Sequence, residues 1–218
     1  AVFRNASGDI YAWRMNGLSI ASGAGIGTLP TEWQIAGMGD MDGNGTADIL
    51  WRRASDGALY SWLMQDTAVT GGAWIGALPD WSVAALSDFT GDGRSDILLR
   101  KTDGTLFIAQ MNGATPSAYL GVGAMGAEWA VRGAGDTNGD GKSDLIWQNT
   151  STGAVWRWVM DGAAIAGADQ LGTVGSPWAV QAVADYTGDG RADVLWRNTA
   201  TGDVYGWTLG HGGVTAQG

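Results

Sequence analysis

The sequence predicts an all-β fold built from a repeat of about 48 residues. Four acidic segments begin at spacings of 48, 48 and 49 residues, at Asp40, Asp88, Asp136 and Asp185. A Trp precedes each segment by seven residues, at Trp33, Trp81, Trp129 and Trp178. Between the acidic segments, short alternating stretches are separated by glycine-containing turns, a pattern that favours strands. Four strands in a repeat of roughly 40–50 residues are typical of a propeller blade, so we expect a β-propeller of four-stranded antiparallel blades.

The first full repeat shows how each strand is predicted. An apolar stretch, 33–38, leads into the acidic segment, and the β-rich stretch 48–52 follows it. A turn ending at Gly57 then gives way to 58–64, which alternates with a period of two, and a weaker strand, 69–77, ends the repeat. Glycine recurs at this turn because a tight turn often requires a positive φ.

The chain is expected to form one domain, residues 1–218, of four repeats and a partial one. The partial repeat is 1–28, and the others are 29–76, 77–124, 125–173 and 174–218. The chain thus holds five copies of the second strand and four copies of the first strand and acidic segment. Two interpretations remain open: five blades with one incomplete, which we favour, or a segment of a larger propeller whose ring other sequence completes.

Composition excludes several classes of protein. With 45% hydrophobic residues the chain has enough apolar surface to fold, and without cysteine it has neither a disulfide framework nor a thiolate metal site. A sequence pI near 4.3 argues against nucleic acid as a partner. No apolar run approaches the ~18 residues of a membrane span, so we expect no membrane insertion.

Oxygen-bearing side chains stand at positions 1, 3, 5 and 9 of every acidic segment, and position 7 varies. The resulting candidate metal ligands are Asp40, Asp42, Asn44, Thr46 and Asp48; Asp88, Thr90, Asp92, Arg94 and Asp96; Asp136, Asn138, Asp140, Lys142 and Asp144; and Asp185, Thr187, Asp189, Arg191 and Asp193. Position 7 is included for its backbone carbonyl alone. Glycine at position 6 lets the chain fold back around an ion.

Calcium is the metal that suits these loops. Hard oxygen ligands in a flexible loop favour Ca²⁺ over Mg²⁺, and transition metals prefer His or Cys. Position 12, for example Trp51, does not provide the bidentate Glu of an EF-hand. The alternative is a set of Asx turns without metal. Four copies with the same ligand positions favour about four Ca²⁺ ions.

These motifs resemble a known family. The segment Asp-x-(Asp/Asn/Thr)-Gly-(Asp/Asn)-Gly-x-(Ala/Ser)-Asp, followed by Ile-Leu-Trp-Arg and Val-Tyr-x-Trp, is similar to the FG-GAP/VCBS repeat, which also forms blades of integrin α-subunit propellers. The resemblance implies a β-propeller with calcium in the loop between the first two strands of a blade. It also implies an extracellular protein that contacts carbohydrate or other cells. The chain is shorter than the seven-bladed integrin domain, so that blade count and ligand site are not transferred.

Residues that depart from the repeat are the better functional candidates. Trp74 and Tyr119 are expected at matching fourth-strand positions, where other repeats have Gly25 and Gln170. We interpret both as weak ligand-binding candidates. Arg53 and Lys101 replace the Asn of other repeats on adjacent blades. The recurrent Arg4, Arg52, Arg100 and Arg197 are expected to make salt bridges or backbone contacts within blades.

We expect no enzyme. Glycoside hydrolysis needs a carboxylate pair at a defined separation, and Glu32, Asp80 and Glu128 merely recur before the repeat Trp. His211, the single histidine, has no nucleophile beside it. A propeller enzyme is therefore kept only as a remote alternative.

The sequence favours a calcium-stabilised binding module of a secreted protein, lectin-like or adhesive, at the bacterial cell surface or free outside the cell. Its expected partner is a carbohydrate or a cell-surface protein. The alternative is a structural or assembly propeller that a neighbouring chain or segment completes, with self-association through an open blade edge.

The loops hold 12 of the 22 acidic residues, so the remainder carries 10 acids against 12 bases. The negative charge is thus concentrated at the ion sites.

Overall fold

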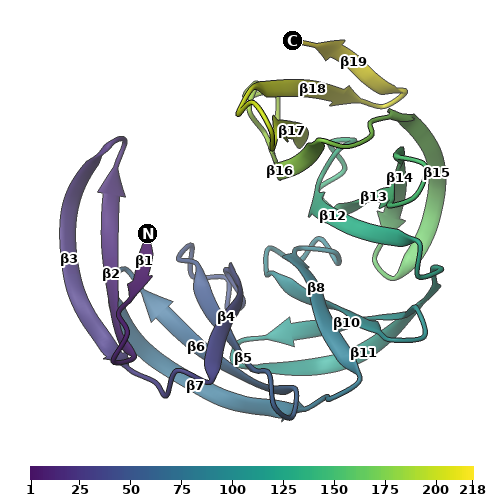
Figure 1. The fold of residues 1–218 in the computed structure, drawn as a ribbon. Coiled ribbons are helices and arrows are strands. Elements are labelled where there is room, and N and C mark those ends of the chain that lie inside the picture. The colour runs from purple at the N-terminus through teal and green to yellow at the C-terminus, as the bar shows by residue number, and fades with distance from the viewer.

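The computed structural model describes all of residues 1–218 and forms five antiparallel sheets that follow one another around an arc (Figure 1). Blade 1 consists of β1 (Val2–Arg4), β2 (Asp9–Asn16) and β3 (Ser19–Thr28). Blade 2 consists of β4 (Trp33–Gly39), β5 (Asp48–Arg53), β6 (Ala58–Gln65) and β7 (Ala68–Ala77). Blade 3 consists of β8 (Trp81–Ser87), β9 (Asp96–Lys101), β10 (Thr105–Asn112) and β11 (Thr115–Ala124).

Blades 4 and 5 repeat the same order. Blade 4 consists of β12 (Trp129–Gly135), β13 (Asp144–Asn149), β14 (Ala154–Asp161) and β15 (Ala164–Thr173). Blade 5 consists of β16 (Trp178–Ala184), β17 (Asp193–Asn198), β18 (Val204–Gly210) and β19 (Gly213–Gln217). The predicted all-β propeller with one incomplete blade is confirmed. The chain forms no helix long and apolar enough to span a membrane.

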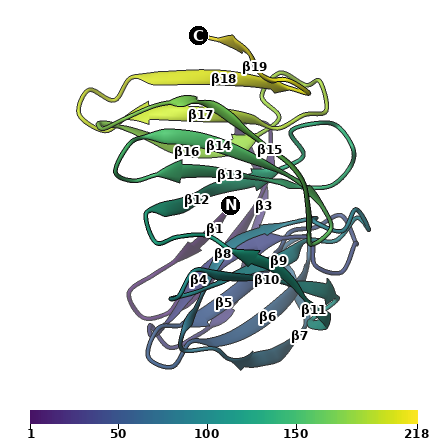
Figure 2. The same ribbon diagram turned by 90° about the vertical axis from the view of Figure 1, so that its right-hand side faces the viewer.

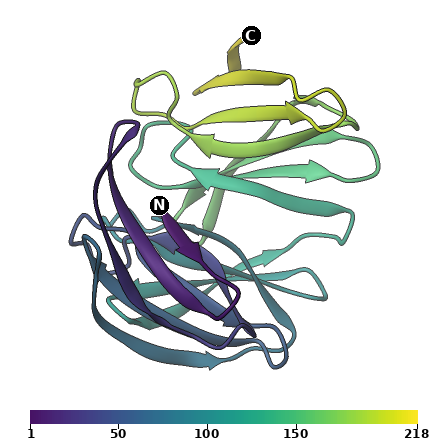
Figure 3. The same ribbon diagram turned by 60° about the vertical axis from the view of Figure 1, so that its left-hand side comes forward.

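The arc is open between its first and last blades. Figure 1 shows β1–β3 and β16–β19 on either side of an opening, and Figure 3 shows the same separation from another side. Figure 2 shows blades 4 and 5 lying above blades 2 and 3. Blade 1 lacks the first strand that the other four blades have, so the free edge of its sheet is β1. The chain by itself does not close a ring in this structure.

The recurrent turns need glycine because the backbone of each turn lies very close to the segment that leads to the next blade. Gly57 has φ +68°, and a Cβ at this position would lie 2.3 Å from the carbonyl oxygen of Leu78. Gly104 has φ +91°, and its Cβ would lie 2.2 Å from the carbonyl oxygen of Met125. The turn carbonyl accepts a backbone hydrogen bond from the same connecting segment, such as Leu78 N to Gly57 O at 3.1 Å. The turn therefore anchors the link between one blade and the next.

The recurrent arginines connect neighbouring blades, which corrects the expectation that their contacts lie within a blade. Arg4 of blade 1 donates to the carbonyl of Pro30, and Arg52 of blade 2 donates to the carbonyl of Trp81 at 2.9 Å. Arg100 of blade 3 donates to the carbonyl of Gly126 at 2.8 Å. In blade 4 the shorter Gln148 donates to the carbonyl of Val174 at 2.7 Å. These bonds satisfy carbonyls at the start of the next blade, where regular sheet pairing has not begun.

Apolar side chains fill each joint between blades. The joint between blades 2 and 3, for example, contains Met41, Leu50 and Leu59 from one side and Ile97 and Leu99 from the other, all nearly inaccessible to solvent. Three similar clusters occupy the remaining joints. Burial of these side chains is the main stabilising contribution to the arc, at about 25 cal/mol per Å² of apolar surface.

Strand register corrects the expected match between Trp74 and Tyr119. Trp74 pairs with Tyr60 of the third strand, and in blade 3 the corresponding pair is Phe107 with Gly121. Tyr119 instead pairs with Ala109, two residues along the strand. Because residues two apart point to the same side of a strand, the sequence pattern does not distinguish the two alignments.

This register explains why blade 3 lacks the second aromatic residue of its third strand. Blades 1, 2 and 4 place a Trp opposite a small residue, in the pairs Trp13 with Gly23, Trp62 with Gly72 and Trp158 with Ala168. A Cβ on Gly23 would lie 2.7 Å from the indole of Trp13, so in blade 1 the ring leaves no room for a side chain, whereas blade 5 pairs Trp207 with Gln217. Blade 3 reverses the arrangement, with small Ala109 on the third strand and Tyr119 on the outer strand.

Restoring the repeat pattern in blade 3 tests this exchange. We expect Ala109→Trp alone to lower the free energy of unfolding by about 1–3 kcal/mol, because the indole overpacks against Tyr119. Tyr119→Gly alone removes the ring that covers Ala109. The double variant A109W/Y119G recreates the Trp–Gly pair and should lose less than the sum of the single losses, by at least ~0.5 kcal/mol. Urea unfolding of the four proteins measures this coupling, and additive losses would contradict the explanation.

Candidate functional site: the acidic loops and the outer face of blades 2 and 3

The four acidic loops join the first and second strands of blades 2 to 5. Glycines at positions 4 and 6 of each loop have positive φ, for example +79° at Gly43 and +83° at Gly45. These left-handed residues turn successive N–H groups inward, and such a concave arrangement binds an anionic group. The carboxylate of position 1 occupies it. Asp40 accepts bonds from Gly43 N at 2.8 Å and Gly45 N at 2.7 Å.

The same bonds form around the first carboxylate of the other loops. Asp88, Asp136 and Asp185 each accept the N–H of the position 6 glycine, at 2.7, 2.8 and 2.9 Å. In the last loop these backbone bonds, led by the one from Gly190, lower the pKa of Asp185 below its ordinary value. Backbone N–H groups thus surround the first carboxylate of each loop in the same way.

The carboxylate of position 9 lies inside the blade. Asp48 is fully buried and accepts the N–H of Met41 in its own loop and the N–H of Met64 in the third strand, both at 2.7 Å. The equivalent Asp96 accepts the N–H groups of Phe89 and Met111. Asp144 and Asp193 make the corresponding bonds in blades 4 and 5.

Burial makes ionisation of these inner carboxyls costly. Desolvation raises the pKa of Asp48 and Asp144, and it raises the pKa of Asp96 to about 6. The nearby charges of other loop carboxylates raise these pKa values further, while the backbone hydrogen bonds oppose the effect. A cation placed among the carboxylates would offset both the desolvation and the repulsion.

Only the first loop brings three carboxylates together. One oxygen each of Asp40, Asp42 and Asp48 lies within 4.8 Å of the others. Because calcium–oxygen distances are 2.3–2.6 Å, two ligands of one ion lie no more than about 5 Å apart. The spacing of these three oxygens therefore suits a calcium ion, although Asp42 also accepts the Asn44 side-chain amide at 3.1 Å. Asn44 and Thr46, the other predicted ligands, lie in the same loop, and the Asn44 side-chain oxygen accepts Thr46 N at 2.7 Å.

The other three loops gather their carboxylates less closely, because position 3 is Thr90, Asn138 or Thr187 and the third acid moves to position 5. That acid has another partner in each case. Asp92 pairs with Arg94 at 3.2 Å, and Asp189 pairs with Arg191 at 3.7 Å. Asp140 accepts the Asn138 side-chain amide at 3.0 Å. Cation binding in these loops would require the position 5 side chain to turn away from this partner.

The loops also contact one another, which the sequence pattern did not predict. Ser95 N donates to the carbonyl of Asp40 in the preceding loop at 2.6 Å, and Ser143 N donates to that of Asp88 at 2.7 Å. Ala192 N continues the series to Asp136 at 2.5 Å. The position 7 side chains Arg94, Lys142 and Arg191 pack beside the position 4 glycine of the preceding loop. The variable position 7 therefore brings a side chain, and in these three loops a positive charge, to the neighbouring loop.

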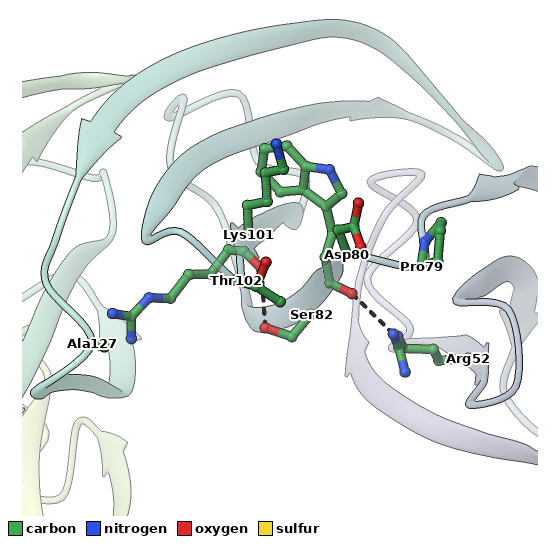
Figure 4. A pocket seen from close by; sticks show the side chains of 9 residues that line it. Arg52, Pro79, Asp80, Ser82, Lys101, Thr102 and Ala127 are labelled. Carbon is green, nitrogen blue, oxygen red and sulfur yellow. Dashed lines mark hydrogen bonds between the residues drawn. The ribbon is translucent and has the colours of Figure 1, made fainter.

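A polar hollow of about 350 Å³ between blades 2 and 3 contains Arg52, Arg100 and Lys101. Figure 4 shows the guanidinium of Arg52 and the ammonium of Lys101 pointing in different directions. Arg52 is bound to the carbonyl of Trp81, and Lys101 lies 3.5 Å from Asp103. The cations are therefore committed to separate partners and do not converge as an anion site.

The departures from the repeat gather on the outer part of blades 2 and 3. Arg53 and Lys101 lie opposite Trp33 and Trp81 in the strand pairing, where blades 4 and 5 have Asn149 and Asn198. The same two blades carry Trp74 and Tyr119, each about half exposed. Both rings and both cations thus belong to two adjacent blades.

In blade 2 the exposed ring continues an aromatic cluster. Trp74 meets Trp33 edge-on at 6.4 Å, and Tyr60 meets Trp33 at 6.5 Å. The Arg53 guanidinium lies over Trp33 at 5.0 Å and is 3.4 Å from Glu32. In blade 3 an apolar hollow of about 200 Å³ is lined by Trp81, Phe107 and Tyr119 together with two leucines. Burial against this hollow raises the pKa of Tyr119.

Comparison with known families identifies part of the chain. Residues 136–196 match the FG-GAP-like repeat. The matched segment is similar to that repeat. It runs from the first acid of the third loop to the second-strand Trp of blade 5, and the resemblance inferred from the sequence is confirmed by the match. A search of curated proteins finds no significant match to the chain.

Two solved structures are similar in fold to nearly the whole chain. The Photorhabdus luminescens Tc holotoxin pore, mutation TccC3-D651A, aligns over 93% of this chain with a TM-score of 0.50 and 14% identity. The BBS1N chain in complex with ARL6DN aligns over 97% with a TM-score of 0.53 and 15% identity. The aligned region is 13% of the toxin chain and 75% of the BBS1N chain. At these identities the likeness is one of fold alone.

Proposed function

We propose that this FG-GAP-repeat propeller is a calcium-stabilised extracellular binding module and that its ligand is a carbohydrate. The observation that carries the proposal is the clustering of Trp74, Tyr119, Arg53 and Lys101 on blades 2 and 3. Residues that form the propeller recur in every blade, whereas these four depart from the repeat in neighbouring blades. Function in such a fold depends on residues added to a common scaffold.

The chemistry of the blade 2 cluster suits a sugar. A sugar ring has apolar C–H faces and a rim of hydroxyl groups, and the exposed indole of Trp74 offers a flat apolar surface beside Trp33. Arg53 and Glu32 lie next to these rings. Arg53 is held by Asp56 at 2.6 Å, and the Glu32 carboxylate can accept from hydroxyls. An aromatic surface with a few polar groups at its edge is typical of small-molecule sites.

The hollow in blade 3 offers a second aromatic surface on the neighbouring blade. Its aromatic walls, Trp81 and Phe107, meet at 5.5 Å in an edge-on arrangement, and Tyr119 adds a hydroxyl at the rim. A second sugar unit of an oligosaccharide would place its apolar face here. Aromatic and arginine side chains also favour contact with a cell-surface protein, which is the other outcome of the binding test.

The first acidic loop joins β4 and β5 at the ends of these strands that lie away from Trp33 and Arg53. A calcium ion in this loop would stabilise the blade that carries the sugar surface. In the first loop Asp40, Asp42 and Asp48 would hold the ion, and its charge would neutralise three crowded carboxylates. Extracellular modules bind calcium at about 10⁻⁴–10⁻³ M, a range that suits a secreted protein. We propose the same role, with weaker convergence, for the other three loops.

Melting curves with calcium and with EDTA test the metal. We expect calcium to raise the Tm, because binding to the folded state at about 100 times Kd adds about 2.7 kcal/mol. Asp42→Asn removes one carboxylate of the first loop with little change of shape and should reduce this rise. Asp80→Asn, at an acid outside the loops, is the matched control and should keep it. An identical Tm in calcium and EDTA would contradict a structural metal.

A glycan array followed by titration tests the ligand. We expect binding of at least one glycan, weakened about tenfold or more in Trp74→Ala, which corresponds to ~1.4 kcal/mol. Gln170→Ala changes the residue at the same register position in blade 4 and should bind like the parent chain. The carbohydrate proposal fails if no glycan binds, or if W74A and Q170A bind equally well.

A further inference from the structure

The buried apolar core of the interior joints is built mainly from second and third strands. We call the side that a blade turns to the next blade in the chain its forward face, and the opposite side its backward face. In the joint between blades 4 and 5, Ile146 and Val155 of the forward face meet four buried residues of the backward face, Val194, Trp196, Trp207 and Leu209. All six lie on the second or third strand. The first strand also packs against this core, through Trp178, Val180 and Val183 of β16.

The forward face of blade 5 is not covered by another blade. Val204 is 60% exposed, whereas the residues at its place in the earlier blades, Leu59, Leu106 and Val155, are at most 1% exposed. Tyr186 is 52% exposed, whereas its counterparts Met41, Phe89 and Thr137 are fully buried. Beside these residues lies a hollow of about 400 Å³, partly lined by Leu195 and Trp207. In each earlier blade the following blade covers this face.

Blade 1 carries the complementary backward face, also uncovered. Phe3 is 45% exposed, whereas Trp51, Leu99, Trp147 and Trp196 at its place are at most 3% exposed. Met15 is 42% exposed, whereas Met64, Met111, Met160 and Leu209 are at most 2% exposed. The rings of Phe3 and Trp13 already pack at 4.4 Å, as Trp147 and Trp158 do at 5.0 Å. The aromatic side chains of this face are therefore arranged as they are on a backward face inside the arc, although no blade covers them.

We propose that the forward face of blade 5 in one copy docks on the backward face of blade 1 in a second copy. The chain holds both halves of a joint that it forms four times internally, so the second copy provides the complementary surface. The interior joints keep blades 1 and 5 of one molecule on opposite sides of the opening (Figure 1), so its own two faces do not meet. A head-to-tail contact of this kind joins copies into a ring or a longer row.

Blade 1 has the second and third strands, which supply most of the buried apolar core of an interior joint, and it lacks the first strand. Its β1 and β2 supply Phe3, Trp13 and Met15, and β17 and β18 of the other copy supply Leu195 and Val204. The sugar surface proposed above lies on blades 2 and 3. The two proposals therefore stand or fall separately.

Two charged variants, each blocking one face, test the contact. Val204→Asp blocks the forward face, and Met15→Asp blocks the backward face. By sedimentation, the parent chain should show a mass that rises with concentration, and each variant alone should remain a monomer. An equimolar mixture should form dimers and nothing larger, because the intact forward face of M15D binds the intact backward face of V204D. Val69→Asp, at another exposed valine, should associate like the parent chain.

Other outcomes overturn the proposal. A parent chain that stays monomeric over the whole concentration range excludes a second copy as the occupant. A mixture that stays monomeric, or single variants that still associate, excludes these two faces as the contact. Circular dichroism checks the fold of each variant. If an aspartate variant does not fold, Val204→Thr and Met15→Gln provide milder changes at the same positions, with the same expected pattern at reduced strength.

Discussion

In every complete blade one buried carboxylate joins the acidic loop to the third strand. Asp144 is fully buried and accepts bonds from Thr137 N at 3.0 Å and Met160 N at 2.9 Å, and the Thr137 hydroxyl donates to it as well. The register between the third and outer strands shifts between Val159 and Met160, where the outer strand has one extra residue and the Met160 N–H turns to the carboxylate. The same shift occurs at Met64, Met111 and Leu209. It also occurs at Met15 of blade 1, which has no acidic loop, so the carboxylate binds a shift that forms without it and thereby fixes where the loop returns to the sheet.

The joints between blades depend on the acidic loop that this carboxylate holds in place. Because the loop is fixed, its backbone can receive the N–H of the following loop, as Asp88 receives Ser143. The arginine of the second strand then reaches the start of the next blade, and apolar side chains of the second and third strands fill the space between. The terminal blades show what the joint contributes, since Val204 and Met15 are exposed there and their counterparts inside the arc are buried. Blade 1 also lacks the acidic loop, so no carboxylate is present to accept the Met15 N–H.

Sequence periodicity predicted much of this architecture. The second strand of blade 2 was expected at 48–52 and occurs at Asp48–Arg53, and the third was expected at 58–64 and occurs at Ala58–Gln65. These limits follow from alternation and from turn glycines, which are local signals. The match of Trp74 with Tyr119 was wrong, because outer-strand register depends on bulges that leave the period-two pattern unchanged. The packing of Arg94 on the preceding loop is a contact in space, which spacing along the chain does not determine, whereas the loop spacing placed Asp40, Asp42 and Asp48 at one predicted ion site.

The unfolding free energy of Asp144→Ala tests most directly whether the buried carboxylate holds the blade together. With EDTA present, loss of metal contributes nothing, and the variant leaves two buried N–H groups without an acceptor. Each such group costs about 1–3 kcal/mol, so the account predicts a loss of at least ~2 kcal/mol in urea unfolding, against almost none for Asp80→Ala. A loss below ~1 kcal/mol for Asp144→Ala would contradict it.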